Sequence, residues 1–416
     1  MGSFKKIIHN PSLVTIGAAE SISGIGDWIT LMAVYANLVF RGGGGVAQSS
    51  GILLAGLLPI LLASPFAGWL CDHHNRKYLM IASQVISGVV VSGLIFTTRI
   101  EIIYLLLALQ AVSISVMSPA RQAVVPALVS AEDFSFVNAF FQQLSSIIKI
   151  GAPVLAGLVL TILTPRQAII LDVVSFALAA LTLLRLPNLP PVGQKSVPDL
   201  LKNIEPKNKV LEIFLKSSGL RLVFVSIFFG VLVIVGFDVL ASVYIRDYLQ
   251  RGEQFFGLSI GLVGVGTLIA SILVMTRKKQ SNLWRDVAVG IGFLALIPLS
   301  LSIGVFSGNP AFSRILVLFS CLIGGLGNGL LNVQIVSLLQ HLTPQHVLGR
   351  ISGLFQSTAV AGQLIGIVLT PLLVPIILSI STYFLISAMA LSALALTILL
   401  QMHKLNKPET THRETT

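Results

Sequence analysis

Long apolar stretches separated by short polar segments run along this whole chain. A helix needs about 20 apolar residues to cross the hydrocarbon core of a bilayer, and the sequence offers twelve such stretches. The predicted membrane-spanning helices cover residues 12–40, 48–71, 77–98, 102–120, 138–163, 167–187, 220–246, 256–276, 284–306, 312–338, 350–376 and 379–402. The pattern therefore predicts an all-α membrane protein with twelve transmembrane helices.

One long polar segment, Leu186 to Gly219, divides these stretches into two sets of six. We therefore predict an N-terminal six-helix half at 1–187, a cytoplasmic linker at 188–219, a C-terminal six-helix half at 220–403 and a cytoplasmic tail at 404–416. A weak internal repeat agrees, since Leu128–Gln142 aligns with Leu342–Gln356 at a spacing of 214 residues. Parallel internal repeats of this kind occur in secondary transporters.

The composition excludes a soluble protein. Hydrophobic residues make up 55% of the chain and charged residues 10%, whereas soluble domains carry about a quarter of charged residues. The apolar run Leu13–Phe40 is too long for a signal-peptide core, so we expect it to be retained. If the N-terminus is cytoplasmic, twenty of the 27 lysines and arginines fall on the cytoplasmic side and six on the other. This bias predicts that both termini are cytoplasmic.

The sequence lacks the residues that several classes of function require. The two cysteines, Cys71 and Cys321, give neither a disulfide framework nor a metal spacing. There is no Gly-x4-Gly-Lys-Ser/Thr loop for ATP, and no polar segment is long enough for an enzyme domain. The net charge of +11 reflects membrane topology rather than nucleic-acid binding. We expect no metal, no cofactor and no enzyme activity.

A dense polar segment, Gly68-Trp69-Leu70-Cys71-Asp72-His73-His74-Asn75-Arg76-Lys77, lies between the second and third predicted helices. It resembles the signature loop of the major facilitator superfamily of secondary transporters, Gly-x-Leu-Ala-Asp-Arg-x-Gly-Arg-Lys. The matching residues are Gly68, Leu70, Asp72, Arg76 and Lys77. Asn75 replaces a glycine and is expected to keep a left-handed turn. The resemblance implies a cytoplasmic latch between the halves, and a basic loop that only fixes topology is the alternative.

The fifth predicted helix carries a second similarity. Residues 151–157 resemble a degenerate form of the superfamily's antiporter motif, which ends Gly-Pro-x-x-Gly-Gly. Proline removes one intrahelical hydrogen bond, and small residues allow close helix approach. The resemblance implies a bend at Gly151, Pro153 and Gly157 that helps to set export. Ordinary small-residue packing is the alternative.

Further short matches resemble the branch of the superfamily that includes macrolide exporters and the enterobactin exporter. They are Gly26-Asp27-Trp28, Pro119-x-Arg121, Pro126, Asn138 and the Gly349-Arg350 pair of the second-half loop. The resemblance covers essentially the whole chain. It implies the major facilitator fold, in which two pseudo-symmetric six-helix halves surround a central cavity and work by alternating access.

Ionisable side chains within the predicted helices are functional candidates, because charge there costs roughly 2.5–3.5 kcal/mol even on insertion scales. Asp27 and Lys149 lie about 21 and 17 Å from the cytoplasmic ends of their helices at the helical rise per residue. We therefore expect Asp27 to pair with Lys149 or to exchange a proton. Glu20 lies seven residues earlier on nearly the same helix face and is a second proton candidate. A static ion pair that fixes helix register is the alternative.

Aromatic residues on several predicted helices suit a substrate cavity, since a cavity for bulky amphiphiles is apolar with a few polar groups. The candidate cavity residues are Trp28, Tyr35, Phe140, Phe228, Asp238 and Asn332. Core packing or lipid contact is the alternative for any single aromatic.

These patterns lead to one functional hypothesis. We expect a monomeric secondary transporter of the bacterial inner membrane that exports a small amphiphilic compound, such as a macrolide-like drug or a siderophore, with protons as the coupling ion. An importer, or a lysolipid or metabolite transporter of the same fold, is the first alternative. A transport-inactive membrane receptor or assembly factor is an alternative of another class.

Overall fold

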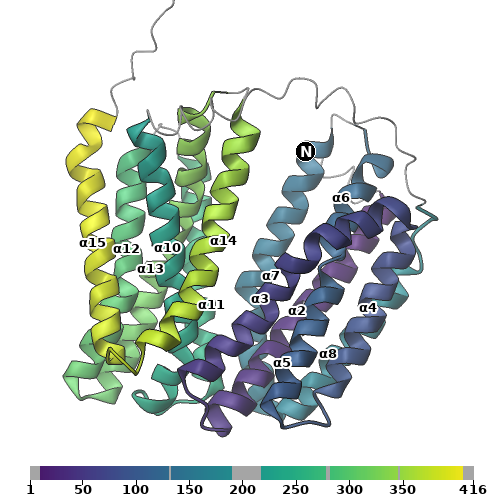
Figure 1. The fold of residues 1–416 in the computed structure, drawn as a ribbon, viewed down its shortest axis with the longest axis horizontal. Helices are drawn as coiled ribbons and strands as arrows, with labels where there is room; N and C mark the ends of the chain where they lie inside the picture. The colour runs from purple at the N-terminus through teal and green to yellow at the C-terminus, as the bar shows by residue number, and fades with distance from the viewer. Residues whose placement is uncertain (1–9, 131–132, 190–216, 278–281, 345–346, 406–416) are drawn as a thin grey trace, which may run out of the picture. The chain divides into compact units, whose positions relative to one another are not determined.

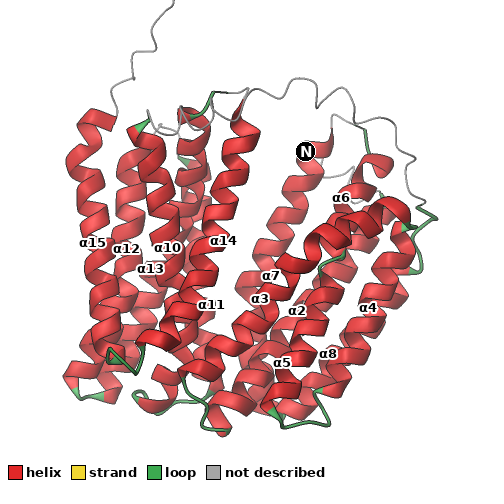
Figure 2. Ribbon diagram, in the orientation of Figure 1, coloured by secondary structure: helices red, strands yellow, loops and turns green. Residues whose placement is uncertain are grey.

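The computed structural model describes residues 10–130, 133–189, 217–277, 282–344 and 347–405, and these are almost entirely helical (Figure 2). Within these ranges the helices form twelve rods, two of them interrupted. The elements are α2 Pro11–Tyr35 with η1 Ala36–Arg41, α3 Val46–His73, α4 Arg76–Gly93, α5 Ile100–Ile114 with α6 Met117–Leu128, α7 Phe134–Ile162, α8 Pro165–Leu183, α10 Ser218–Asp247, α11 Glu253–Thr276, α12 Leu283–Ser307, α13 Pro310–Leu342, α14 Leu348–Leu373 and α15 Ile380–Leu405 (Figure 1).

Eleven of the twelve rods are long and apolar enough to cross a membrane by themselves, among the residues that the structure describes. The remaining one is α4, which has 18 residues and includes Arg76, Lys77 and Gln84. These polar side chains lower its hydropathy, although α4 corresponds to the third predicted helix. The prediction of an all-α protein with twelve helices is confirmed.

Capping side chains fix where many of the helices begin, because they accept bonds from the free N–H groups of the first turn. Asn10 accepts hydrogen bonds from the N–H groups of Ser12 and Leu13, at 3.1 and 3.3 Å. Capping residues of the same kind precede α4, α8, α10, α12 and α13: Asn75, Thr164, Ser217, Asn282 and Asn309. The polar residues between the apolar stretches therefore also fix where these helices begin.

Residue contacts divide the chain into two compact units. Unit 1 comprises Met1–Pro198 together with Arg251–Gly261, and unit 2 comprises Asp199–Gln250 together with Leu262–Thr416. Most of the predicted linker at 188–219 lies outside the described residues, and the boundaries of the predicted halves stay a prediction. The first turns of α11 belong to unit 1, whereas the rest of this helix belongs to unit 2.

In unit 1, α2 packs against α7 and α8, α4 packs against α8 and α5, and α3 packs against α5. A cluster of buried apolar side chains joins the start of α2 to α4, α6, α7 and α8. Its fully buried members include Leu13, Ile16, Met80, Phe141 and Leu183. This close packing fixes the neighbours of α2, the helix that carries Glu20 and Asp27.

In unit 2, α12 packs against α13 and α15, and α10 packs against α14 and α15. A seam of glycines brings α11 and α13 together. A Cβ atom on Gly325 would overlap the backbone carbonyl oxygen of Val263, and one on Gly329 would overlap that of Thr267. The Thr267 hydroxyl also donates a hydrogen bond to the Gly325 carbonyl at 3.1 Å. Small residues permit this backbone approach, as is usual between membrane helices.

We predict that Gly325→Ala lowers the thermal stability of the purified protein in detergent. The added methyl group meets backbone atoms that cannot rotate away, and overpacking of this kind costs about 1–3 kcal/mol. Gly292→Ala in α12 is the matched control, because a Cβ atom there meets no atom within 4 Å and alanine favours a helix. Equal melting temperatures for the two variants would contradict the close seam.

Candidate functional site

Asp27 lies in the middle of α2 and is partly exposed. The amide of Gln110, a buried residue of α5, donates a hydrogen bond from Nε2 to Asp27 Oδ1 at 2.8 Å. An amide donor stabilises a carboxylate without neutralising its charge. Asp27 is therefore held in place by a neutral partner.

A second carboxyl group comes to the same region from α8. Asp172 is completely buried, and its Oδ2 accepts a hydrogen bond from the Thr30 hydroxyl of α2 at 2.5 Å. Its Oδ1 accepts another from Ser175 at 2.9 Å. A Cβ atom on Gly26 would overlap both the Asp172 carboxylate and the Ser175 hydroxyl. Glycine at position 26 therefore makes room for this carboxyl group against α2.

Asp27 and Asp172 form what we call the carboxyl pair. Gly26 and Thr30, which flank Asp27 along α2, both contact Asp172, and the two carboxyl groups interact electrostatically. Among the described residues, neither of them forms an ion pair with a lysine or arginine. Two like charges on neighbouring helices repel each other more strongly where water is scarce than they do in water.

Glu20, two turns before Asp27, has a different partner. It forms an ion pair with Arg121 of α6, with 2.9 Å between Oε1 and Nε, and both side chains are 16% exposed. The Arg121 guanidinium also lies over the ring of Phe141, with Cζ 4.6 Å from the ring centre. A cation over an aromatic face is attracted by its quadrupole. Arg121 is thus held between α2 and α7.

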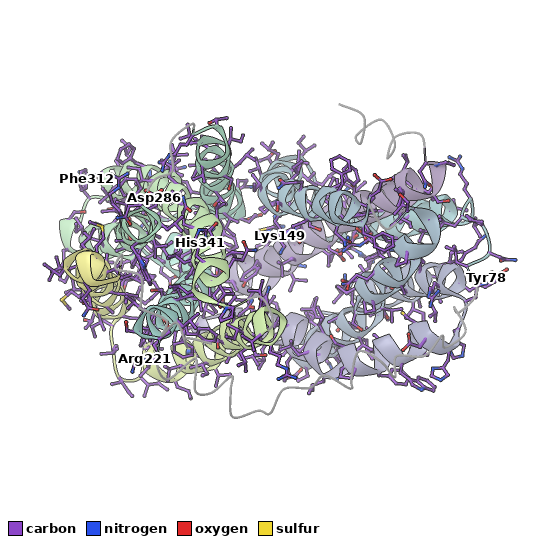
Figure 3. The ribbon with its side chains drawn as sticks, turned by 90° about the horizontal axis from the view of Figure 1, so that it is seen from above. Tyr78, Lys149, Arg221, Asp286, Phe312 and His341 are labelled. Carbon is purple, nitrogen blue, oxygen red and sulfur yellow. The ribbon has the colours of Figure 1, made fainter. Side chains whose placement is uncertain are left out.

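The expected pairing of Asp27 with Lys149 is wrong. Lys149, labelled in Figure 3, is an exposed residue of α7, and no ion pair in the described part of the chain includes it. The sequence interpretation ended the fourth helix at residue 120 and assigned Arg121 to a loop. The structure instead continues this rod as α6 to Leu128, which carries Arg121 inward as the partner of Glu20.

The loop that resembles the superfamily signature is built from two helix ends. Asn75 caps α4, and its side chain accepts a hydrogen bond from the Lys77 N–H at 3.0 Å. The backbone of Asn75 is extended, with φ −66° and ψ 117°. The expected left-handed turn at this position is therefore wrong, and capping is the physical reason for asparagine here.

The two basic residues of this loop, Arg76 and Lys77, form hydrogen bonds with the chain that follows α8, the sixth helix. The backbone N–H of Arg76 donates to the Leu189 carbonyl at 3.0 Å, and Lys77 Nζ donates to the Leu186 carbonyl at 2.6 Å. Asp72 is exposed, and a Cβ atom on Gly68 would meet no atom within 4 Å. The latch role of the loop stays a prediction.

Of the three residues of the proposed bend, two lie at a close helix contact. α7 continues through Pro153, whose carbonyl oxygen would be 2.9 Å from a Cβ atom on Gly257 of α11. Gly157 also faces Gly257, since its own Cβ atom would lie 3.3 Å from the Gly257 Cα. Gly151 has no such neighbour within 4 Å. Pro153 and Gly157 therefore serve packing against α11 in this structure.

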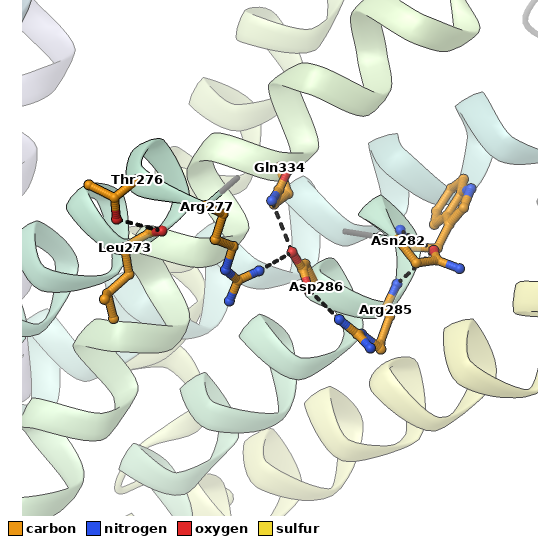
Figure 4. Close-up of polar contacts among 8 residues, drawn as sticks. Leu273, Thr276, Arg277, Asn282, Arg285, Asp286 and Gln334 are labelled. Atoms are coloured by element: carbon orange, nitrogen blue, oxygen red, sulfur yellow. Dashed lines mark hydrogen bonds and ion pairs between the residues drawn. The ribbon is translucent and has the colours of Figure 1, made fainter. Parts of the chain in front are cut away.

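Unit 2 holds a polar cluster that the sequence interpretation missed (Figure 4). Asp286, in the first turn of α12, is buried and forms an ion pair with Arg277 at 2.7 Å. Gln334 of α13 donates a hydrogen bond to the same Asp286 oxygen at 3.0 Å, and Arg285 lies 3.8 Å from the other oxygen. An acid in a first helical turn that is closely preceded by arginines is the signal that could have found it.

The candidate cavity residues do not form one described site. Tyr35 is buried against Phe256, with 5.2 Å between ring centres. Asn332 is exposed and bonds back to Asn328 of its own helix at 2.8 Å. The other four candidates are half-buried in α2, α7 and α10: Trp28, Phe140, Phe228 and Asp238. Gly349 and Arg350 lie in the first turn of α14.

The sequence matches the profile of the Major Facilitator Superfamily over residues 16–367. The chain belongs to the Major Facilitator Superfamily. It is 25% identical to macrolide efflux protein A of Streptococcus pyogenes over 392 residues, which cover 92% of this chain and 94% of that protein. It is 23% identical to the MFS-type transporter YfiS of Bacillus subtilis, covering 86% and 85%. It is also 23% identical to the multidrug efflux pump Tap of Mycolicibacterium fortuitum, covering 87% and 88%.

Solved structures of superfamily transporters share the fold. A POT family transporter in complex with 5-aminolevulinic acid superposes with a TM-score of 0.71 at 15% identity, covering 96% of this chain and 97% of that one. A mutant form of the nucleoside transporter NupG gives 0.67 at 14% identity, covering 96% and 100%. As a superfamily member, the protein is a multi-pass secondary transporter of a small-molecule substrate and not an enzyme.

We predict that this transporter loses stability when either member of the Glu20–Arg121 ion pair is neutralised. Glu20→Gln or Arg121→Gln leaves one largely buried charge unpaired, which costs about 1–3 kcal/mol. The double variant removes both charges and should recover part of the loss. The melting temperature in detergent is measured for the wild type, the two single variants and the double variant. Strictly additive effects would show that the two side chains do not interact.

Proposed function

We propose that this transporter is a proton-coupled exporter of small amphiphilic compounds. Two of its relatives are named for efflux, one of macrolides and one of multiple drugs, and they align with most of the chain. The observation that carries proton coupling is the carboxyl pair of Asp27 and Asp172, which has hydrogen-bond donors but no ion-pair partner among the described residues.

Binding of one proton gives the carboxyl pair two charge states. With a proton on either acid, the repulsion between the two carboxyl groups is removed. When the proton leaves, Gln110, Thr30 and Ser175 still donate hydrogen bonds but supply no positive charge. Since the two acids belong to the packed helices α2 and α8, the charge state changes how closely these helices fit.

Glu20 and Arg121 provide a second group that responds to protons on the same helix. A proton on Glu20 would weaken its attraction to Arg121 and free the guanidinium, which contacts α7 through Phe141. We infer that the two acids of α2 act in sequence along one helix face. The expected role of Lys149 in coupling is not retained.

The substrate class follows from the surroundings of Asp27. Trp28, the residue after Asp27 in α2, is a half-buried aromatic residue. Phe140 of α7 lies nearer the start of α2, close to Gly17. An aromatic residue next to an acid suits a compound with a hydrophobic body and a basic group. Such a cation would compete with the proton for the carboxyl pair, which couples release of one to uptake of the other.

We also propose the membrane, the orientation and the oligomeric state in which this transporter works. The excess of lysine and arginine in one set of loops supports cytoplasmic termini in the bacterial inner membrane. We propose that a single chain is the working unit, as expected from the sequence.

The experiment uses everted membrane vesicles that hold a proton gradient. Macrolides, tetracyclines, cationic dyes and siderophores are added in turn, and dissipation of the gradient is recorded. We predict a response to one compound class that falls at least tenfold in Asp27→Asn and in Asp172→Asn, because each variant removes one of the two acids that can bind the proton. Asp247→Asn is the matched control, since Asp247 is exposed and paired with its neighbour Arg246.

The pH dependence gives a second readout. Substrate binding to the wild-type protein should weaken as the pH falls, since protons occupy the carboxyl pair, and Asp27→Asn should remove this dependence. Unchanged gradient dissipation and unchanged pH dependence in both variants would exclude the carboxyl pair from coupling. A response with substrate accumulation in the opposite direction would exclude export.

A further inference from the structure

Three uncharged polar side chains of unit 2 form a continuous run of hydrogen bonds. Asn332 Nδ2 donates to Asn328 Oδ1 at 2.9 Å, and Asn328 Nδ2 donates to the hydroxyl of Thr267 at 3.2 Å. We call Thr267, Asn328 and Asn332 the amide chain. Thr267 belongs to α11 and the two asparagines to α13, and all three belong to unit 2. The amide chain is therefore complete within one unit.

Backbone carbonyl groups fix the direction of these hydrogen bonds, because a carbonyl oxygen only accepts. The Thr267 hydroxyl has to donate, since it lies 2.8 Å from the Val263 carbonyl oxygen and 3.1 Å from that of Gly325. Its oxygen then accepts the hydrogen of Asn328. At the other end, Asn332 Nδ2 lies 2.8 Å from the backbone carbonyl oxygen of Asn328. The nitrogen of the Asn332 amide therefore faces its own helix, and the amide cannot be flipped without losing this bond.

One acceptor remains at the end of the amide chain. Both hydrogens of Asn332 Nδ2 are used, one by the backbone and one by the side chain of Asn328. In the described part of the protein, no group donates a hydrogen bond to Asn332 Oδ1, and Asn332 is exposed. An amide that donates at its nitrogen becomes a better acceptor at its oxygen. Asn332 Oδ1 is thus an accessible and polarised acceptor.

Helix packing does not account for Asn332. Gly325 and Gly329 bring α11 and α13 together, and the bond from Asn328 to Thr267 crosses this seam. Asn332 adds no bond to another helix, since both of its hydrogen bonds return to Asn328 of α13. An amide that is carried into a membrane with a free oxygen costs free energy. Its presence therefore points to a contact with water or with a ligand.

Two faces of α13 are exposed, and they differ in polarity. Phe312, Ile315 and Phe319 are 50%, 71% and 61% exposed and suit lipid. Asn332 lies about 140° around the helix from Phe319, and about 9 Å along the axis from the middle of α13. This depth is within a hydrocarbon core that is about 30 Å thick. A polar side chain at this depth is favourable where the helix lines a water-filled space, so Asn332 marks a water-lined face of unit 2.

We propose that Asn332 Oδ1 binds a hydroxyl group of the transported compound, with Asn328 and Thr267 as positioning residues. An acceptor that cannot flip selects a hydrogen-bond donor, and because it is ordered in advance, binding loses little entropy. A compound without a donor would cover this oxygen and leave it unpaired, which costs free energy. The inference rests on the proposed amphiphilic substrate and adds that this substrate carries hydroxyl groups. It rests neither on proton coupling nor on the direction of transport.

Cysteine labelling tests whether Asn332 faces water. Asn332→Cys is compared with Phe319→Cys, which lies about as far from the middle of α13 but on the apolar exposed face. The native residues Cys71 and Cys321 are buried. We expect a charged maleimide to label Asn332→Cys about tenfold faster in lipid nanodiscs, because the reactive thiolate forms where water reaches it. Equal labelling rates would overturn the water-lined face and the proposal with it.

Equilibrium binding tests the acceptor itself. Erythromycin, a macrolide with several hydroxyl groups and one basic group, is compared with tetraphenylphosphonium, a lipophilic cation without a hydrogen-bond donor. The Kd of each is measured in nanodiscs without a proton gradient. Asn332→Ala should weaken erythromycin binding about fivefold, which corresponds to about 1 kcal/mol, and should leave tetraphenylphosphonium binding unchanged. Asn332→Ser is the matched control and should recover most of the erythromycin affinity, because its hydroxyl can donate to the Asn328 carbonyl and still accept.

Three results would overturn the acceptor role of Asn332. They are an unchanged erythromycin affinity in Asn332→Ala, an equal loss of affinity for tetraphenylphosphonium, and a failure of erythromycin to bind the wild type. Melting temperatures of both variants should match the wild type, since Asn332 bonds to no other helix. The vesicle experiment can fail separately. Erythromycin binding that depends on Asn332 without discharge of the gradient would reject proton-coupled export and retain the binding site.

Discussion

Lipid offers no hydrogen-bond partners, so a polar side chain within the membrane is stabilised when another part of the chain supplies them. Asp172 is satisfied from α2 by Thr30 and from its own helix by Ser175. Asp286 is satisfied by Arg277 and by Gln334 from α13. Because the partners come from different helices, these bonds fix which helices are neighbours and how each is rotated. The same requirement brings two acids together and makes the carboxyl pair possible.

Packing meets a related constraint, since apolar side chains gain little from leaving a lipid environment for a protein interior. The helices instead approach where side chains are smallest. Gly325 and Gly329 join α11 to α13, and Gly257 joins the first turns of α11 to α7. Gly26 is different, because the space that it leaves is filled by a carboxylate and a hydroxyl. A small residue here serves a polar contact and determines where charge can reside.

The sequence predicted the helices well because a membrane crossing imposes a minimum length of apolar residues, and capping residues mark the starts. It predicted poorly which side chains contact each other. Position along a helix follows from counting residues, but the direction in which a side chain points depends on the rotation of two packed helices. Asp27 and Lys149 were matched by depth alone, while Arg121 was missed because its rod is interrupted after Ile114 and then continues. Asp286 was missed because a charge near a helix start is usually solvated.

The π-helical turn at the end of α2 has a consequence for the phase of this rod. A π turn holds one more residue than an α-helical turn, so it rotates everything that follows by about 100° relative to a regular helix. Arg41, which forms an ion pair with Glu253, lies at the end of this turn, whereas Asp27 lies before it. A single-residue insertion or deletion between Ala36 and Phe40 would therefore redirect Arg41 and leave the carboxyl pair untouched. The contact between Arg41 and Glu253 and the position of Asp27 can therefore change independently of each other.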